Sequence, residues 1–302
     1  MKRKILITGS SGQVGSYLVE KLIKNYNVTG ADIKKSNIDL VNKVTRIGDI
    51  KNKGFVEDIT KDIDIIIHTA AQIDIKKSIK NPISDAKLNI IGTLNLLESA
   101  RKNEKISKFI FFSTCGVYGN HKYLPIDEKH PLKPISPYAL SKMTGEKYCM
   151  MYNQLFDLPT VVLRPFNIYS NRENISKRYV SIVYRFAHNI KKGKKIIIHG
   201  DGSQKRDLIH IKDVASFIKK IISSKKTNGE IFNIGTGKPL SVIDIARLVI
   251  KISNKDEKSN LVFDDTVKGR IDESYADISK AKKFGFQPNI SIEEGIKEIL
   301  SG

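Results

Sequence analysis

Short hydrophobic runs alternate with amphipathic stretches along the first half of the chain. The hydrophobic runs are rich in β-branched residues, and they predict strands at residues 4–8, 27–32, 43–47, 63–69, 109–113 and 160–163. Between these runs, apolar residues recur at helical spacing, which predicts helices at residues 14–24, 83–101 and 138–156. Strands that alternate with helices form βαβ units. We therefore expect an α/β fold with a doubly wound parallel sheet of the Rossmann type.

The pattern becomes less regular after Arg164-Pro165. Turn-forming residues predict loops at 170–176 and 200–204, and helical spacing resumes at 214–222, 242–252 and 292–300. We expect a nucleotide-binding domain at residues 1–168, with a return segment at about 206–233. A smaller C-terminal α/β domain for the substrate would then occupy residues 169–302.

The composition is that of an ordinary globular protein. Hydrophobic residues make up 40% and charged residues 28% of the 302 positions, which excludes wholesale disorder. No run approaches the ~18 consecutive apolar residues of a membrane-spanning helix, and the N-terminus lacks a signal-peptide pattern. Cys115 and Cys149 are too few for a disulfide framework and lack the spacing of metal ligands. These features predict a cytoplasmic protein without a structural metal or a membrane partner.

The net charge raises the question of a nucleic-acid partner. Lys and Arg number 52 against 32 Asp and Glu, which gives a formal charge of +20. The excess is mostly lysine spread along the chain, and its densest runs lie at predicted helix ends, where cations favour the helix dipole. Nucleic-acid binding calls for clustered cations with interleaved aromatic residues. We therefore do not expect a nucleic-acid partner.

The first predicted strand leads directly into a glycine-rich turn. Gly9, Gly12 and Gly15 lie at the start of an amphipathic helix. Glycines at this spacing allow a tight turn, close approach of the backbone to a pyrophosphate, and close packing of helix on strand. The helix N-terminus adds backbone N–H groups and the positive end of its dipole.

An acidic residue follows the second predicted strand. Asp32 lies where a carboxylate hydrogen-bonds the hydroxyls of an adenosine ribose, and its charge would repel a 2′-phosphate. The sequence therefore favours NAD as the cofactor, although the neighbouring Lys34 and Lys35 leave NADP open as the alternative.

Tyr138 and Lys142 form the most specific chemical pattern in the chain. Four residues apart in a predicted helix, they lie on one helix face. A phenol ordinarily titrates near pH ~10. A neighbouring ammonium and a positive nicotinamide stabilise the phenolate and make it a useful base. Thr114 follows the fifth predicted strand, 24 residues before Tyr138.

The glycine spacing resembles that of the extended short-chain dehydrogenase/reductase superfamily. Further landmarks resemble its NAD-dependent nucleotide-sugar epimerases and dehydratases, including those that act on UDP-glucose and UDP-galactose. In chain order, these landmarks are residues 48–50, 68–72, 89–93, 112–119, 138–142, 164–167, 200–213, 233–237 and 276–281. Among them, His68 is expected to be structural rather than catalytic.

The resemblance implies three groups of functional residues. The catalytic residues are Thr114, Tyr138 and Lys142. The cofactor-binding residues are Gly9, Ser11, Gly12, Gln13, Val14, Gly15, Asp32, Asp49, Ile50, Ala70, Ala71, Tyr138, Lys142 and Pro165. The substrate-binding residues are Thr114, Asn167, Arg206, Arg270 and Ser274, with Asn167 and Arg206 on the diphosphate.

Two positions depart from part of this group. Nucleotide-sugar 4,6-dehydratases carry Asp-Glu after the catalytic Thr, whereas this chain has Cys115 and Gly116. The related decarboxylases also keep a Glu at the second position. The resemblance therefore implies an NAD-dependent nucleotide-diphosphate-sugar 4-epimerase, acting on UDP-glucose/UDP-galactose or UDP-N-acetylhexosamines through a 4-keto sugar. Ser274, a small residue three positions before Asp277, favours acceptance of 2-acetamido sugars.

Other interpretations of the sequence remain open. One is an NAD(P)-dependent nucleotide-sugar reductase or dehydratase, and another is a non-catalytic superfamily member that binds NAD or RNA. The helices at 83–101 and 138–156 resemble the pair that forms a four-helix dimer interface in this superfamily, which implies a homodimer. Burial within the monomer explains the same apolar stripe equally well.

Overall fold

The computed structural model describes residues 2–173, 180–264 and 272–302. Its strands are β1 (Lys4–Thr8), β2 (Asn27–Asp32), β3 (Thr45–Ile47), β4 (Ile65–His68), β5 (Lys108–Phe112), β6 (Thr160–Pro165), β7 (Asn167–Tyr169), β8 (Ile196–His199), β9 (Lys205–Arg206), β10 (Leu208–His210), β11 (Glu230–Ile234), β12 (Leu240–Ser241), β13 (Leu261–Asp264) and β14 (Glu273–Ser274).

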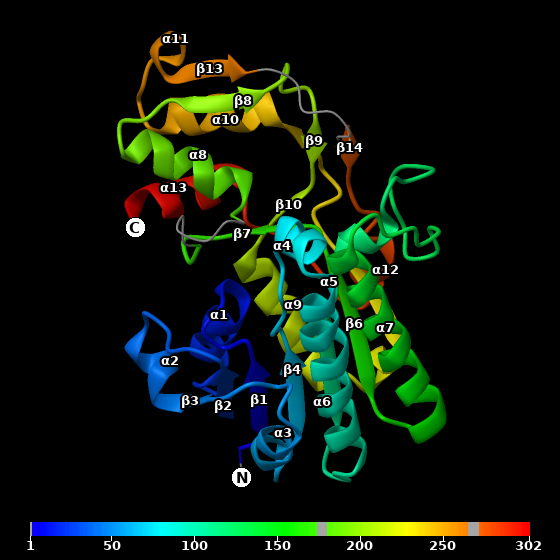
Figure 1. The fold of residues 1–302 in the computed structure, drawn as a ribbon. Coiled ribbons are helices and arrows are strands. Elements are labelled where there is room, and N and C mark those ends of the chain that lie inside the picture. Colours follow the sequence, from blue (N-terminus) through cyan, green and yellow to red (C-terminus); the bar gives the residue numbers. More distant parts are fainter. Residues whose placement is uncertain (1, 174–179, 265–271) are drawn as a thin grey trace. The chain divides into compact units, whose positions relative to one another are not determined.

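Its helices alternate with these strands through the first half of the chain (Figure 1). They are α1 (Gln13–Leu22), α2 (Asp39–Val44), α3 (Lys53–Thr60), α4 (Ile75–Lys80), α5 (Pro82–Ala86), the π-helix η1 (Lys87–Ile91), α6 (Gly92–Arg101), the 3-10 helix η2 (Cys115–Tyr118), α7 (Pro137–Phe156), α8 (Ile182–Lys191), α9 (Ile211–Ser223), the 3-10 helix η3 (Lys225–Thr227), α10 (Val242–Ile252), α11 (Glu257–Asn260), α12 (Ser279–Lys283) and α13 (Ile292–Ser301).

The chain divides into two compact units. The first comprises Met1–Gly119, Pro131–Arg164 and Phe217–Phe232, and the second comprises Asn120–His130, Pro165–Ser216 and Asn233–Gly302. The assignment of cofactor binding to residues 1–168, with the return segment 206–233, and of substrate binding to 169–302 stays a prediction.

A seven-stranded sheet organises the first unit, in the order β11-β6-β5-β4-β1-β2-β3. The pairs from β3 through β6 are parallel, as Ile5 opposite Val28 on β2 and Ile65 on β4 illustrates. The strand order reverses at β1, and ligands of such sheets bind at the carboxyl ends of the strands beside the reversal. The predicted α/β fold class is confirmed.

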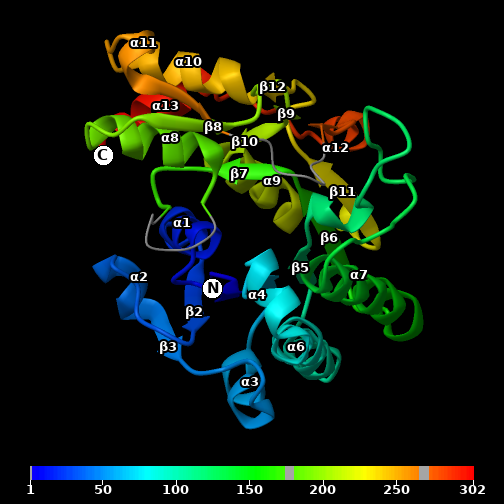
Figure 2. The same ribbon diagram turned by 45° about the horizontal axis from the view of Figure 1, so that its top comes forward.

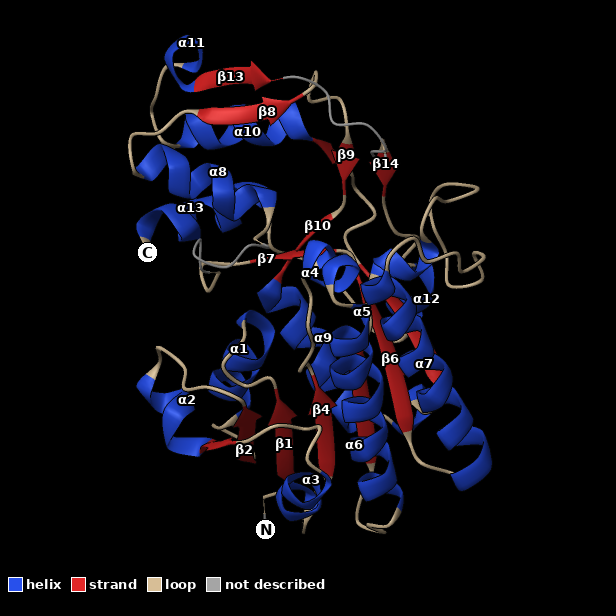
Figure 3. Cartoon of the chain, in the orientation of Figure 1, coloured by secondary structure: helices blue, strands red, loops and turns tan. Residues whose placement is uncertain are grey.

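Helices α3, α6 and α7 cover one face of this sheet (Figure 3). Alternate strand residues such as Leu6, Ile66 and Phe109 point to this face, because side chains along a strand alternate between its two sides. They are buried against Ile59 of α3 and Leu97 of α6. This packing fixes α7, the helix that carries the predicted catalytic pair.

The predicted elements and the observed ones differ where elements are short, and also at the ten-residue helix α8, which was not among the predicted helices. The helix expected at 83–101 is a continuous run of α5, η1 and α6, with one widened π turn in the middle. The prediction of a strand at 43–47 is wrong for its first two residues, because residues 43 and 44 are the end of helix α2. Val41 is the buried residue of that helix, so its apolar pattern is too brief to predict a helix.

The second unit has its own core. Helices α8, α10 and α13 pack together around Phe186, Ile245 and Ile296, and the paired strands β8 and β13 lie over them (Figure 2). A three-stranded sheet, in the order β12-β9-β14, lies elsewhere in this unit. Within the described ranges, the structure contains no helix that is both long and apolar enough to cross a membrane.

Candidate active site

The glycine turn joins the carboxyl ends of β1, β2 and β4. Gly9 has φ +73°, and its N–H donates to the Ala31 oxygen at 2.7 Å. A Cβ at Gly9 would lie 2.7 Å from the Ala70 nitrogen, so the turn contacts the end of β4 directly. A Cβ at Gly15 would lie 2.1 Å from the Gly9 oxygen, which leaves room for glycine alone.

Gly12 has a different environment from the other two glycines. A Cβ there would meet just the Gly9 oxygen, at 3.1 Å, so the remaining space beside this backbone is open. Gly12 is also the N-cap of α1, which begins with Gln13 and Val14, and makes no side-chain capping bond. An open glycine backbone at a helix N-terminus fits the pyrophosphate of a dinucleotide.

The Asp32 carboxylate is held at the end of β2 by backbone N–H groups. Ser11 N donates to Asp32 Oδ2 at 2.9 Å, and Lys34 N donates to Oδ1 at 3.2 Å. Ser11 Oγ donates in turn to the Lys34 oxygen at 2.8 Å. The structure therefore brings Ser11 and Asp32 together and fixes the acid beside the turn, where it fits a ribose.

The remaining predicted cofactor residues of the first unit lie near the same sheet edge. Ile50 is buried, and a Cβ at Gly92 would lie 2.7 Å from its Cδ1. Asp49 Oδ1 accepts from the Lys51 N–H at 2.9 Å. Ala70 and Ala71 follow β4 after one intervening residue, Thr69, and are half-buried. These residues and the glycine turn together fit NAD.

Thr114 lies beside the first turn of α7. It is the N-cap of η2, and its Oγ1 accepts from Gly116 N at 3.1 Å. A Cβ at Gly116 would lie 3.4 Å from Thr114 Oγ1 and 3.7 Å from the Cβ of Ala139, the residue after Tyr138. The structure thus places Thr114, Gly116 and the start of α7 in one neighbourhood. Any side chain at position 116 would begin there.

Lys142 is almost completely buried on α7, with 2% of its surface exposed. Its Nζ lies 4.1 Å from the centre of the Phe111 ring, in a cation–π contact. Burial lowers the pKa of Lys142 to about 8, although nearby Cys149, Glu146 and Asp85 act in the opposite direction. The ammonium form therefore still predominates at neutral pH.

His68 is buried at the end of β4 and serves as a neutral hydrogen-bonding link. Thr93 Oγ1 donates to the Asn89 oxygen at 2.6 Å, so it accepts from His68 Nε2 at 3.0 Å. His68 Nδ1 then accepts from Thr8 Oγ1 at 2.7 Å. Burial, together with the Lys142 charge, lowers the pKa of His68 well below its ordinary value. This agrees with the structural role expected for it.

Sequence reasoning missed a buried network under α7. The Asp85 carboxylate accepts from Ser141 Oγ at 2.6 Å, Gln72 Nε2 at 2.9 Å and Asn89 Nδ2 at 3.2 Å. Ser141 Oγ also lies 2.9 Å from the backbone carbonyl oxygen of Tyr138. Ser141 lies inside the Tyr-x-x-x-Lys pattern, and this position was the one feature of the sequence that could have indicated the network. The network anchors the turn of helix that bears Tyr138 and Lys142.

The predicted substrate residues of the second unit also lie close together. Arg206 of β9 pairs with Ser274 of β14, so the two are direct neighbours across strands. Asn167 begins β7, beside Pro165 at the end of β6. Both its backbone N–H and its Nδ2 donate to the backbone carbonyl oxygen of Asp207. Arg270 lies outside the described residues.

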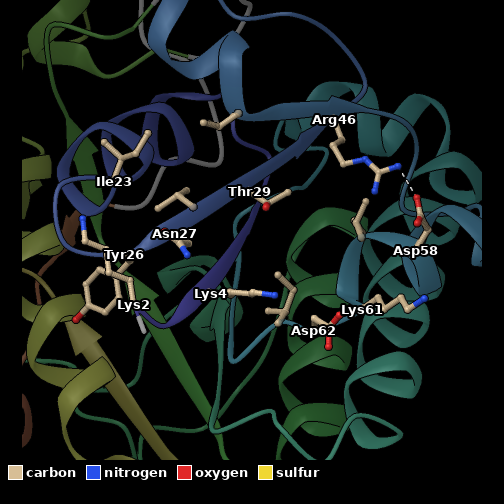
Figure 4. A pocket seen from close by; sticks show the side chains of 14 residues that line it. Lys2, Lys4, Ile23, Tyr26, Asn27, Thr29, Arg46, Asp58, Lys61 and Asp62 are labelled. Atoms are coloured by element: carbon tan, nitrogen blue, oxygen red, sulfur yellow. Dashed lines mark hydrogen bonds and ion pairs between the residues drawn. The ribbon is translucent and has the colours of Figure 1, made fainter.

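Two cavities help to locate binding surfaces. A cavity of 160 Å³ in the second unit has Asn167 and Arg206 in its wall, together with apolar side chains of Val180, Ile182 and Val242. A larger cavity of 620 Å³ lies at the amino ends of β1 and β2 in the first unit (Figure 4). The catalytic candidates follow carboxyl ends of the same sheet, so this larger cavity is not their site.

Comparison with known proteins agrees with this geometry. Residues 5–235 match the family described as "NAD dependent epimerase/dehydratase family". A Methanocaldococcus jannaschii protein, provisionally named a UDP-glucose 4-epimerase, is 38% identical over 98% of this chain and 97% of its own.

Solved structures are similar over the whole chain. The UDP-glucose 4-epimerase of Thermotoga maritima, solved with UDP-glucose, has a TM-score of 0.92 and 33% identity, covering 99% of this chain and 97% of its own. A UDP-N-acetylglucosamine 4-epimerase of Methanobrevibacter ruminantium M1, in complex with UDP-N-acetylmuramic acid, has a TM-score of 0.91 and 29% identity. In that case 100% of this chain and 99% of the other are covered.

Proposed function

This chain belongs to the NAD-dependent epimerase/dehydratase family, and from that premise we propose that it is a nucleotide-diphosphate-sugar 4-epimerase. Its substrates are UDP-glucose and UDP-galactose, or the corresponding UDP-N-acetylhexosamines. The similarity to enzymes named for these sugars supports this choice of substrate class.

The proposed reaction uses the residues of the candidate site as follows. Tyr138 accepts the proton of the sugar 4-hydroxyl as C4 becomes a ketone, and returns a proton when the opposite face of C4 is reduced. Lys142, as an ammonium, stabilises the Tyr138 phenolate, and Thr114 hydrogen-bonds the same oxygen. Asn167 and Arg206 hold the diphosphate. When bound, NAD supplies the reversible two-electron oxidation of C4.

The observation that carries the choice of epimerase over dehydratase is the neighbourhood of Gly116. A side chain at this position would begin 3.4 Å from Thr114 Oγ1, yet glycine offers no acid or base there. Cys115, the preceding residue, is half-buried and not a carboxylic acid. Elimination of water from C5 and C6 needs such groups, whereas 4-epimerisation needs Thr114, Tyr138 and Lys142 together with bound NAD.

The test is to incubate the purified protein, without added cofactor, with UDP-, GDP-, CDP- and dTDP-sugars and to follow the products by NMR. We expect interconversion of 4-epimers with no net consumption of NAD. Tyr138→Phe should lower the rate by about 10²–10⁴-fold. Tyr148→Phe, on the same helix, is the matched control and should keep the rate. A 4-keto-6-deoxy product, or a requirement for stoichiometric NAD(P)H, would contradict the proposal.

The width of the sugar site follows from a single small residue. Ser274 is half-buried beside Arg206 on the neighbouring strand, so its side chain leaves space next to the proposed diphosphate site. We therefore propose that 2-acetamido sugars are accepted. Conversion of UDP-glucose without any conversion of UDP-N-acetylglucosamine would show that this is wrong.

We further propose that the protein is a homodimer through α7 and the helical run α5–η1–α6. Leu140, Met151 and Leu155 on α7 are 50%, 40% and 64% exposed, and Ile83 and Ile91 on the other run are 69% and 47% exposed. Exposed apolar side chains at helical spacing on adjacent helices favour an interface between copies.

Light scattering after size exclusion tests the dimer. Leu155→Glu should yield monomers, whereas Ile197→Glu, at a similarly exposed residue of the second unit, should not. A monomeric wild-type protein would refute the proposed interface. A cytoplasmic location stays a prediction from the sequence.

A further inference from the structure

Asp207 is a fully buried carboxylate between β9 and β10, with no exposed surface. Its Oδ1 accepts from the N and Oγ1 of Thr236 at 2.7 and 2.6 Å. Its Oδ2 accepts from Gly237 N at 3.0 Å and Ala276 N at 3.1 Å. One side chain therefore satisfies hydrogen-bond donors from two segments that are distant in sequence.

The backbone of Asp207 contacts the segments that carry the proposed substrate residues. Its oxygen accepts from Asn167 N at 3.1 Å and from Asn167 Nδ2 at 2.8 Å. Its own N–H donates to the Ser274 oxygen at 3.1 Å. Arg206 precedes it in the chain. Three of the four predicted substrate residues of this unit thus meet at a single residue, and the fourth, Arg270, lies outside the described residues.

The space around this carboxylate is tight. A Cβ at Gly235 would lie 2.4 Å from Asp207 Oδ2, so the backbone before Thr236 approaches the carboxylate as closely as glycine permits. Since each carboxylate oxygen accepts two hydrogen bonds, an isosteric amide cannot replace it. An Asn side chain would turn its NH₂ group either toward the N–H groups of Gly237 and Ala276 or toward the N–H of Thr236, and in either orientation at least one buried N–H would lose its acceptor.

We propose that Asp207 is a positioning residue that sets the spacing of Asn167, Arg206 and Ser274 for the nucleotide sugar. This inference rests on the proposed function, because it concerns how that substrate is held. The three residues contact parts of the substrate that do not react. Their displacement therefore weakens the binding of the substrate and of the transition state alike. Loss of Asp207 should therefore raise KM more than it lowers kcat.

Asp213 provides a matched control in the same unit. It is also a buried aspartate, and its two oxygens accept from Asn289 N at 3.0 Å and Ile290 N at 3.2 Å. These partners are not the segments that carry Asn167, Arg206 or Ser274. Asp213→Asn therefore reports the loss of stability from removing a buried carboxylate, without the proposed effect on the substrate site.

The experiment compares Asp207→Asn and Asp213→Asn in the full chain with its cofactor. It measures steady-state kinetics with UDP-glucose, binding of uridine diphosphate by calorimetry, and thermal unfolding. We expect both variants to unfold at lower temperature. Asp207→Asn alone should raise KM and the Kd of uridine diphosphate by about 10–100-fold, with kcat changed far less. If Asp207→Asn does not fold, Thr236→Val removes one bond to Asp207 and should raise KM by a smaller factor.

The outcomes separate the two claims. Equal changes of KM in Asp207→Asn and Asp213→Asn would overturn the role of Asp207 and leave the proposed function intact. If Asp207→Asn does not fold, an unchanged KM in Thr236→Val would do the same. If the wild-type protein neither binds uridine diphosphate nor converts any nucleotide sugar, the proposed function itself is wrong, and the inference falls with it.

Discussion

Replacing Lys142 by Met should make the protein more stable and less active at neutral pH. Burial lowers the pKa of Lys142 from its ordinary 10.5 to about 8. This fall corresponds to about 3 kcal/mol of unfavourable free energy for the charged side chain in the folded state. Met removes that term but also loses the cation–π contact with Phe111, worth about 1–2 kcal/mol. We expect a net gain of about 1–2 kcal/mol at pH 7.

The pH dependence of this gain gives the prediction a definite sign. Between about pH 8 and 10.5, an unfolded Lys142 keeps its proton while the folded one has released it. The unfolded state then binds more protons, so wild-type stability rises with pH across this range. The advantage of Lys142→Met should therefore be largest below pH 8 and should shrink steadily toward pH 10.5.

Guanidinium unfolding of cofactor-free protein at pH 7, 9 and 10.5 measures the effect. Lys76→Met, at an exposed lysine of α4, is the control and should change stability by less than about 0.5 kcal/mol. The reasoning is refuted if Lys142→Met is less stable than wild type at pH 7, or if the difference does not vary with pH.

Three further predictions follow from buried contacts. Gly15→Ala puts a Cβ 2.1 Å from a backbone oxygen and should abolish retention of NAD, measured as cofactor released on denaturation; normal retention would contradict the turn geometry. Arg164→Met leaves Glu146 buried without its partner and should cost about 3–5 kcal/mol in urea unfolding, and adding Glu146→Gln should recover much of this loss. Asp85→Asn removes a buried negative charge beside Lys142, so both limbs of the pH–rate profile should move to lower pH; an unmoved profile would exclude this electrostatic role.

Some elements with a long or strongly periodic pattern could be predicted from the sequence nearly to the residue, although the amphipathic helix α8 was not among the predicted ones. The strand at 4–8 and the helix at 242–252 have the predicted bounds, and α7 begins one residue early. Helices α3 and α4 were missed because they are short and begin with local capping. Asn52 accepts from Phe55 N and Asp74 from Lys77 N, which requires no long apolar stripe.

The candidate site was predictable where its chemistry is local in sequence. The glycine turn and the Tyr138–Lys142 spacing are each contained in a few residues. The Asp85 network and the Asp207 contacts join segments that are distant in the chain, with no periodic spacing between them. Such polar contacts depend on how strands and helices pack, so hydrophobic pattern and motif spacing carry no signal for them.

The charges around Lys142 explain how a lysine can remain protonated inside this core. Two acids, Glu146 and Asp85, lie near it, and they differ in whether a cation hydrogen-bonds to them. The Glu146 carboxylate accepts three hydrogen bonds from the Arg164 guanidinium, so its charge is already balanced. In the part of the chain that the structure describes, the hydrogen-bond donors to Asp85 are the neutral side chains of Ser141, Gln72 and Asn89. Glu146 and Asp85 both oppose the effect of burial on the pKa of Lys142, which explains why the ammonium form persists in this core at neutral pH.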